Sequence, residues 1–108
     1  MWVDVGIVNP ITGQRVDVKA LVDTSAKFTV VPWWVHERLG LMIIGRRDVR
    51  TAKGYTELDE SFAIVEVKGR RAATPILISR ELSETLIGVI TLEALGLTVD
   101  PTQASLRK

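Results

Sequence analysis

The sequence predicts a single, mostly β domain with one or two short helices. Short stretches of alternating, often β-branched residues recur along the chain, and glycine, proline and asparagine stand between them. The chain has 108 residues, the size of one domain, so residues 1–108 are interpreted as one unit. No linker, low-complexity tract or second domain interrupts the pattern.

The first two strands are expected at residues 2–8 and 15–22, joined by a turn that contains Pro10 and Gly13. The second strand alternates at first and then becomes apolar on both faces, which indicates that it enters the core. Five further strands and a final edge segment follow the same reasoning, at residues 28–31, 47–53, 56–67, 71–78, 85–87 and 104–106.

Two short helices are expected, at residues 33–39 and 91–95. A glycine follows the last apolar residue of each, Gly40 and Gly96, and this is a common signal for a helix end. The same pattern, Glu-x-Leu-Gly-Leu, closes both helices, which indicates partial internal duplication at most.

Composition narrows the functional classes. The net charge is +1, so no general attraction to nucleic acid is expected. The chain has no Cys and one His, which argues against a disulfide framework, a thiol nucleophile and a Cys- or His-rich metal site. We therefore expect no metal and no other cofactor. The start of the chain does not resemble a signal peptide, and no apolar run approaches the ~18 residues of a membrane span, so no membrane partner and a cytoplasmic location are expected.

The most informative segment is residues 20–26, Ala-Leu-Val-Asp-Thr-Ser-Ala. Three apolar residues bring Asp23 to the end of a strand, and small or hydroxylated residues follow at once. Such a turn presents a carboxyl group beside a hydroxyl and free backbone N–H groups. The chain has only one Asp placed this way, so chemistry with two carboxylates needs two chains. Taken alone, the segment is also typical of a strand-ending turn in which the Asp accepts local N–H bonds.

Residues 21–26 resemble the active-site segment of the retropepsin-like aspartic proteases, which reads apolar-apolar-Asp-Thr/Ser-Gly-Ala. The tail, residues 96–101, is similar to the end of the single-domain prokaryotic members. A further segment resembles the family's apolar-apolar-Gly element, which lies under the active-site loop: Leu86, Ile87 and Gly88. The motifs occur in the family's order and cover nearly the whole chain.

A glycine-containing segment, residues 51–55, sits where the family has its flap, a hairpin that closes over the substrate. In this resemblance the substrate-binding flap consists of Ala52, Lys53, Gly54 and Tyr55. Glycine suits the tip because it allows a turn with positive φ and a close approach of its backbone to a peptide.

The resemblance implies a retropepsin-like closed, mostly antiparallel β-fold, one acid-protease half, that works as a homodimer. Asp23 is then the catalytic carboxylate, and the implied activity is an aspartic endopeptidase acting on a peptide or protein substrate. Two carboxylates about 3 Å apart cannot both ionise, so one keeps its proton. The ionised one takes a proton from a trapped water and the protonated one donates to the scissile carbonyl, with no metal and no covalent intermediate.

The rest of the active-site loop follows from the same resemblance. Thr24 braces the loop across the dimer axis, and Ala26 leaves room beside the carboxylate. Ser25 departs from the family, which has Gly there. If this position needs positive φ, Ser costs on the order of 1 kcal/mol or more. If it does not, the hydroxyl can hydrogen-bond the carboxylate, whereas a steric clash would abolish activity. Lys27 is also unusual, and we expect it to point to water.

Some side chains around this loop and hairpin are less specific. The expected apolar walls, for which the sequence does not separate cleft from core, are Val30, Val31, Ile87 and Val89. The basic pair Arg46 and Arg47 is interpreted as part of a solvated face. The acidic residues of the hairpin are interpreted as keeping it soluble and preventing edge pairing: Asp48, Glu57, Asp59 and Glu60.

Two other functions stay open. The first is a catalytically inactive retropepsin-like dimer that acts as a peptide-binding or assembly module, with Ser25 marking lost catalysis. The second is a monomeric, barrel-like binding domain with no pair of carboxylates. The oligomeric state distinguishes the monomer from the two dimers, and activity that depends on Asp23 distinguishes the peptidase from the binding module.

Overall fold

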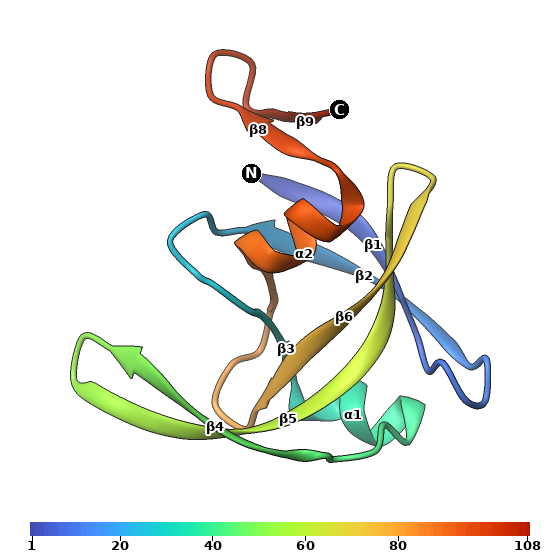
Figure 1. The fold of residues 1–108 in the computed structure, drawn as a ribbon, viewed down its shortest axis with the longest axis vertical. Helices are drawn as coiled ribbons and strands as arrows, with labels where there is room; N and C mark the ends of the chain where they lie inside the picture. The colour runs from blue at the N-terminus through green and yellow to red at the C-terminus, as the bar shows by residue number, and fades with distance from the viewer.

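The computed structural model describes residues 1–108 as nine strands and two helices, α1 (Trp33–Leu39) and α2 (Val89–Leu95) (Figure 1). Both helices end at a glycine in the left-handed region, at φ 61° for Gly40 and 68° for Gly96, as expected. The strands are β1 (Trp2–Val8), β2 (Arg15–Val22), β3 (Thr29–Pro32), β4 (Gly45–Thr51), β5 (Gly54–Val67), β6 (Arg70–Ser79), β7 (Thr85–Ile87), β8 (Thr98–Asp100) and β9 (Ser105–Arg107).

Six strands close into a barrel in the order β1-β2-β7-β3-β6-β5, and β5 pairs back with β1 through Gly6, Ile7 and Val8. β4 lies outside this ring and pairs with β5. Most neighbouring strands are antiparallel, but β2–β7 and β3–β6 are parallel. The predicted mostly β, closed and mostly antiparallel architecture is therefore confirmed, with two parallel pairings that join distant parts of the chain.

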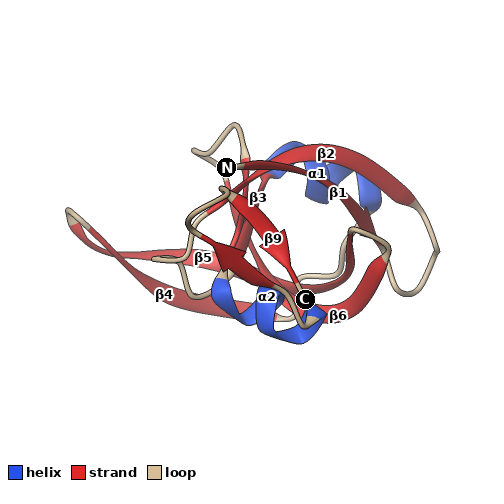
Figure 2. Ribbon diagram, turned by 90° about the horizontal axis from the view of Figure 1, so that it is seen from above, coloured by secondary structure: helices blue, strands red, loops and turns tan.

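The barrel interior is apolar because one side of each long strand faces inward. Alternate residues of β5, such as Ala63 and Val65, have no exposed surface and face the interior, whereas Phe62, just before them, is 45% exposed and faces outward. The two helices lie on opposite sides of the barrel (Figure 2) and bury apolar side chains against it. No helix here combines the length and the apolar character needed to cross a bilayer.

Two hairpins extend from the barrel. The β4–β5 hairpin projects at one end of the molecule, and the β8–β9 hairpin lies at the other end with both chain termini (Figure 1). The last edge segment expected from sequence is thus one strand of a hairpin. β4 begins at Gly45, before the expected residue 47, because the ladder with β5 continues to the base of the hairpin, where the Ile44 N–H donates to the Glu60 carbonyl at 2.8 Å.

Candidate active site

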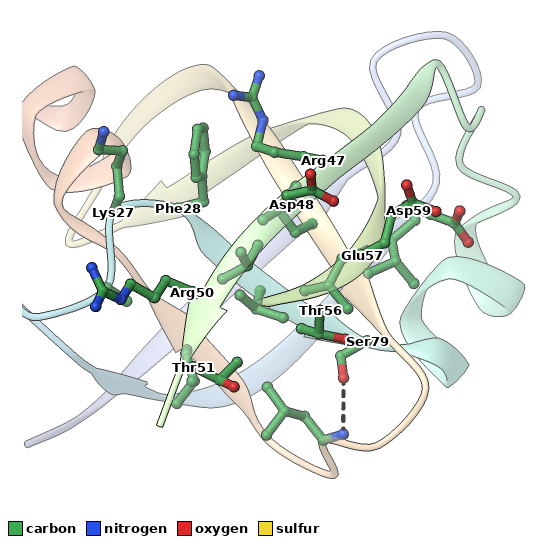
Figure 3. A pocket seen from close by; sticks show the side chains of 18 of the residues that line it. Lys27, Phe28, Arg47, Asp48, Arg50, Thr51, Thr56, Glu57, Asp59 and Ser79 are labelled. Carbon is green, nitrogen blue, oxygen red and sulfur yellow. Dashed lines mark hydrogen bonds between the residues drawn. The ribbon is translucent and has the colours of Figure 1, made fainter. Parts of the chain in front are cut away.

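A cleft of about 820 Å³ lies beside the β4–β5 hairpin (Figure 3). Its lining comes from four segments: the loop after β2, the start of β3, the hairpin strands, and the loop between β6 and β7. Asp23, Ser25 and Ala26 of the predicted active-site loop are among the lining residues. The fold therefore brings the lone Asp-Thr-Ser turn to the wall of this cleft.

Backbone hydrogen bonds fix the turn that carries Asp23. The Asp23 N–H donates to the Ile87 carbonyl at 3.0 Å, so the residue after β2 continues to bond to β7. The Ala26 N–H donates back to the Asp23 carbonyl at 3.1 Å and closes the turn. Asp23 is half-buried, whereas Thr24 at the apex is exposed. The carboxyl group is thus held at the cleft wall while the apex remains accessible.

Ser25 holds one oxygen of the Asp23 carboxyl group. Oδ1 of Asp23 accepts a hydrogen bond from the Ser25 N–H at 3.0 Å and another from the Ser25 hydroxyl at 2.5 Å. Among non-glycine residues only Lys68 and Ala104 have positive φ, so Ser25 carries no strain of that kind. The sequence left open whether Ser25 would be strained or would hydrogen-bond the carboxyl group. In the structure its hydroxyl forms that hydrogen bond.

Gly88 lies directly beneath the segment that follows the active-site loop. A Cβ on Gly88 would lie 2.5 Å from the backbone carbon and oxygen of Phe28, so no other residue fits without a shift. The Gly88 N–H donates to the buried Thr29 hydroxyl at 3.1 Å, and that hydroxyl donates to Thr91 at 2.6 Å. These contacts join the β7–α2 junction to the loop.

The predicted apolar-apolar-Gly segment lies next to the loop that carries Asp23, and its residues differ in their surroundings. Leu86 lines the cleft, opposite Val30 in the β3–β7 register, whereas Ile87 is in the core. Of the four expected apolar walls, Val30 alone lines the cleft: Val31 and Ile87 are fully buried in the core, and Val89 lies in the first turn of α2. Strand alternation explains the difference, since neighbours point to opposite faces.

The tip of the β4–β5 hairpin is a tight turn closed by Thr51, whose hydroxyl donates to the Gly54 carbonyl at 2.9 Å. Gly54 has φ 113°, a conformation that favours glycine, in accord with the expectation. Tyr55 lines the cleft and is 74% exposed. Ala52 and Lys53 are exposed at the tip, beyond the cleft lining.

The hairpin's charged residues are more than a solvated face. The Arg47 side chain donates to both Glu60 oxygens, at 2.9 and 3.4 Å, and its guanidinium carbon lies 4.5 Å from the centre of the Phe28 ring. Arg46 contacts Glu57 at 2.7 Å and Asp59 at 3.4 Å. Counting back from the turn at Gly54 places Arg46 opposite Asp59, whereas Arg47 is opposite Leu58 and reaches Glu60 diagonally. No group of three or more His, Asp or Glu side chains is placed to hold a metal ion.

The loop between β6 and β7 forms a further wall that the sequence did not reveal. The Ser79 hydroxyl accepts hydrogen bonds from the backbone N–H groups of Glu81 and Leu82, both at 3.1 Å. The Arg80 guanidinium lies 3.6 Å from the centre of the Trp33 ring, which ties the loop to α1. Trp33 is far from Arg80 in the chain, so no local pattern indicates this contact.

Structural comparison identifies similar folds among solved proteins. No protein-family model matches the sequence, and no curated protein sequence matches it. The structure of EIAV protease complexed with the inhibitor HBY-793 has a TM-score of 0.75 and 22% identity, over 93% of this chain and 91% of that one. The fold is retropepsin-like. The solution structure of simian foamy virus (mac) protease gives a TM-score of 0.61 at 21% identity, over 89% of this chain and 92% of that one.

Proposed function

We propose that this chain is an aspartic endopeptidase that hydrolyses peptide bonds as a homodimer, with Asp23 of each chain in one shared site. One observation carries the proposal: the lone Asp-Thr-Ser turn, braced by Ser25 and by β7, opens into the cleft of a retropepsin-like fold. The proteases among the structural neighbours support it. Residues 1–108 form the single catalytic domain, and the tail at 96–101 favours the single-domain prokaryotic type.

In this proposal the two carboxyl groups share one proton, because two like charges about 3 Å apart cannot both be maintained. The ionised Asp23 takes a proton from water, and the protonated Asp23 donates to the scissile carbonyl oxygen. Thr24, exposed at the apex of the turn, contacts its copy across the two-fold axis. Ala26 leaves space for the substrate, and residues 52–55 close as a flap and bond to the main chain of an extended peptide.

One observation favours the alternative of an inactive dimer that binds peptides or supports assembly. The Ser25 hydroxyl occupies Oδ1 of Asp23, one of the two oxygens through which the carboxyl group can contact a catalytic water. If the hydroxyl is not displaced when substrate binds, the cleft still accepts a peptide but cannot activate water.

Cleavage of a mixed peptide library, followed by mass spectrometry at roughly pH 3 to 7, tests the proposal, since a carboxyl pair shares a proton in that range. Wild type and Asp23→Asn are compared, after circular dichroism and sedimentation show that both are folded and dimeric. We expect cuts in the wild type alone. Cleavage of the same bonds by Asp23→Asn contradicts the mechanism, and no cleavage by either supports the binding module.

A further inference from the structure

Lys27, Phe28 and Arg47 form one corner of the cleft, called here the cationic corner. Arg47 reaches from β4 across to the Phe28 ring, with 4.5 Å between the guanidinium carbon and the ring centre. In Figure 3 the Lys27 ammonium, the Phe28 ring and the Arg47 guanidinium all project on the same side of the cleft. Two cations therefore flank an aromatic ring next to the active-site loop.

The cationic corner retains positive charge. Glu60 neutralises Arg47 through two hydrogen bonds, and its side chain is only 14% exposed. Lys27 is exposed and has no carboxyl group within ion-pair distance in the chain, whose ion pairs all involve other residues. Lys27 therefore keeps an unpaired positive charge at this corner.

The opposite side of the cleft has the opposite charge. Figure 3 shows two carboxylates there, away from Lys27: Glu57 and Asp59. Arg46 contacts both of them, so two carboxylates against one cation leave one negative charge in excess on this side. A peptide lying in the cleft thus meets a cationic wall on one side and an anionic wall on the other.

The backbone of Lys27 is rigidly placed relative to Asp23. The Ile90 N–H at the start of α2 donates to the Lys27 carbonyl at 3.0 Å, and the preceding carbonyl, of Ala26, accepts from Val89 at 2.9 Å. Gly88 packs against the same segment. Lys27 follows Asp23 by four residues, so its backbone is held close to the active-site loop.

We propose that the cationic corner binds an acidic side chain of the substrate, at one fixed position relative to the cleaved bond. The inference rests on the proposed peptidase function and adds the substrate class: peptides with Asp or Glu near the scissile bond. The Lys27 ammonium pairs with the substrate carboxylate, and the Phe28 ring contacts its methylene groups. The anionic side disfavours the reversed orientation, which gives the cleft a direction as well as a preference.

Charge reversal at Lys27 tests the proposal. In the peptide library the wild type is expected to cut sequences with Asp or Glu at one position on the order of threefold to tenfold faster than those with Asn or Gln there. Lys27→Glu should lose this preference and favour Lys or Arg at the same position. Lys68→Glu is the matched control, because Lys68 is exposed in the β5–β6 turn outside the cleft and gives the same change in net charge.

Peptide retention separates this inference from the peptidase function. Immobilised Asp23→Asn, with and without Lys27→Glu, is exposed to the same library, and the retained peptides are identified. Retention of acidic peptides that depends on Lys27 supports acidic-side-chain binding by the cationic corner, even if the wild type cuts nothing. In that case only the peptidase proposal fails. Cleavage or retention without an acidic preference overturns the corner, and so does a preference that Lys27→Glu keeps.

Discussion

The hydrogen bond between the Ser25 hydroxyl and Oδ1 of Asp23 is the contact that bears most directly on catalysis. The Ser25 N–H already donates to the same oxygen at 3.0 Å. The hydroxyl therefore adds a second donor to an atom that is already held, and in the proposed mechanism it competes with water for that oxygen. Activity then depends on how readily this second donor turns away.

Ser25→Gly is expected to keep or raise kcat/KM, by up to about tenfold, because a hydrogen bond to a charged group is worth about 1.5 kcal/mol or more and no longer has to be broken. Ser25→Ala removes the hydroxyl but keeps the Cβ and should behave in the same way. Initial rates on a single cleaved peptide measure both. A large loss of kcat/KM in folded Ser25→Ala would instead show that the hydroxyl positions the carboxyl group for catalysis.

At the scale of residues, the sequence predicts what is local and misses what is distant. Asp23 and its turn are visible because three apolar residues and two small ones surround them in the chain. The stacking of Arg47 on Phe28 is not visible, because the two residues approach only after β4 has folded back along the cleft. Lys27 was expected to point to water and is exposed, but its place in the cleft wall comes from the fold.

Among the elements, the β7–α2 junction supports the candidate site most closely. It accepts the Asp23 N–H at the Ile87 carbonyl, and it donates the N–H groups of Val89 and Ile90 to the loop. These two donors explain why α2 begins at Val89 and not at the expected residue 91. β-Branched residues are weak helix formers, so the local pattern did not favour them, but their N–H groups have partners across the fold.

Gly88→Ala is expected to destabilise the fold by about 1–3 kcal/mol and to reduce activity, because the added Cβ meets the Phe28 backbone at 2.5 Å and displaces the active-site loop. Gly45→Ala is the control: its Cβ meets nothing within 4 Å, so its effect should stay within about 0.5 kcal/mol. Urea unfolding of both variants measures the difference. Equal unfolding midpoints for the two variants would show that the β7–α2 junction accommodates the added Cβ without loss of stability.

The order of the strands in the sheet cannot be predicted from the sequence pattern of each strand taken alone. β1 and β2 pair through a short turn that the sequence predicts, as do β4 and β5. The parallel pairings of β2 with β7 and of β3 with β6 join segments that are far apart in the chain. Alternation within a strand does not specify which strand it pairs with. The closed β-fold came from the resemblance of the motifs, and the barrel's geometry follows from these long-range pairings.

For the whole molecule, one chain carries the residues for half of a two-carboxylate active site and not for a complete one. The chain offers one carboxyl group on a turn with an exposed apex, one projecting hairpin, and a cleft with walls of opposite charge. The sequence of this chain contains a single Asp-Thr-Ser segment, at residues 23–25. In the proposed mechanism the second carboxyl group therefore comes from a second copy of the chain.

Activity is accordingly expected to fall steeply when the protein is diluted below the dimer dissociation constant, because a monomer has no carboxyl pair. Mixing wild type with Asp23→Asn sharpens the test, since mixed dimers carry only one catalytic carboxyl group. After subunit exchange, a ninefold excess of Asp23→Asn should reduce the activity per wild-type chain to about a tenth, by random pairing. Peptide cleavage measured alongside sedimentation gives both quantities. A specific activity that is independent of dilution and of added Asp23→Asn would mean that each chain acts alone, and the shared site would have to be abandoned.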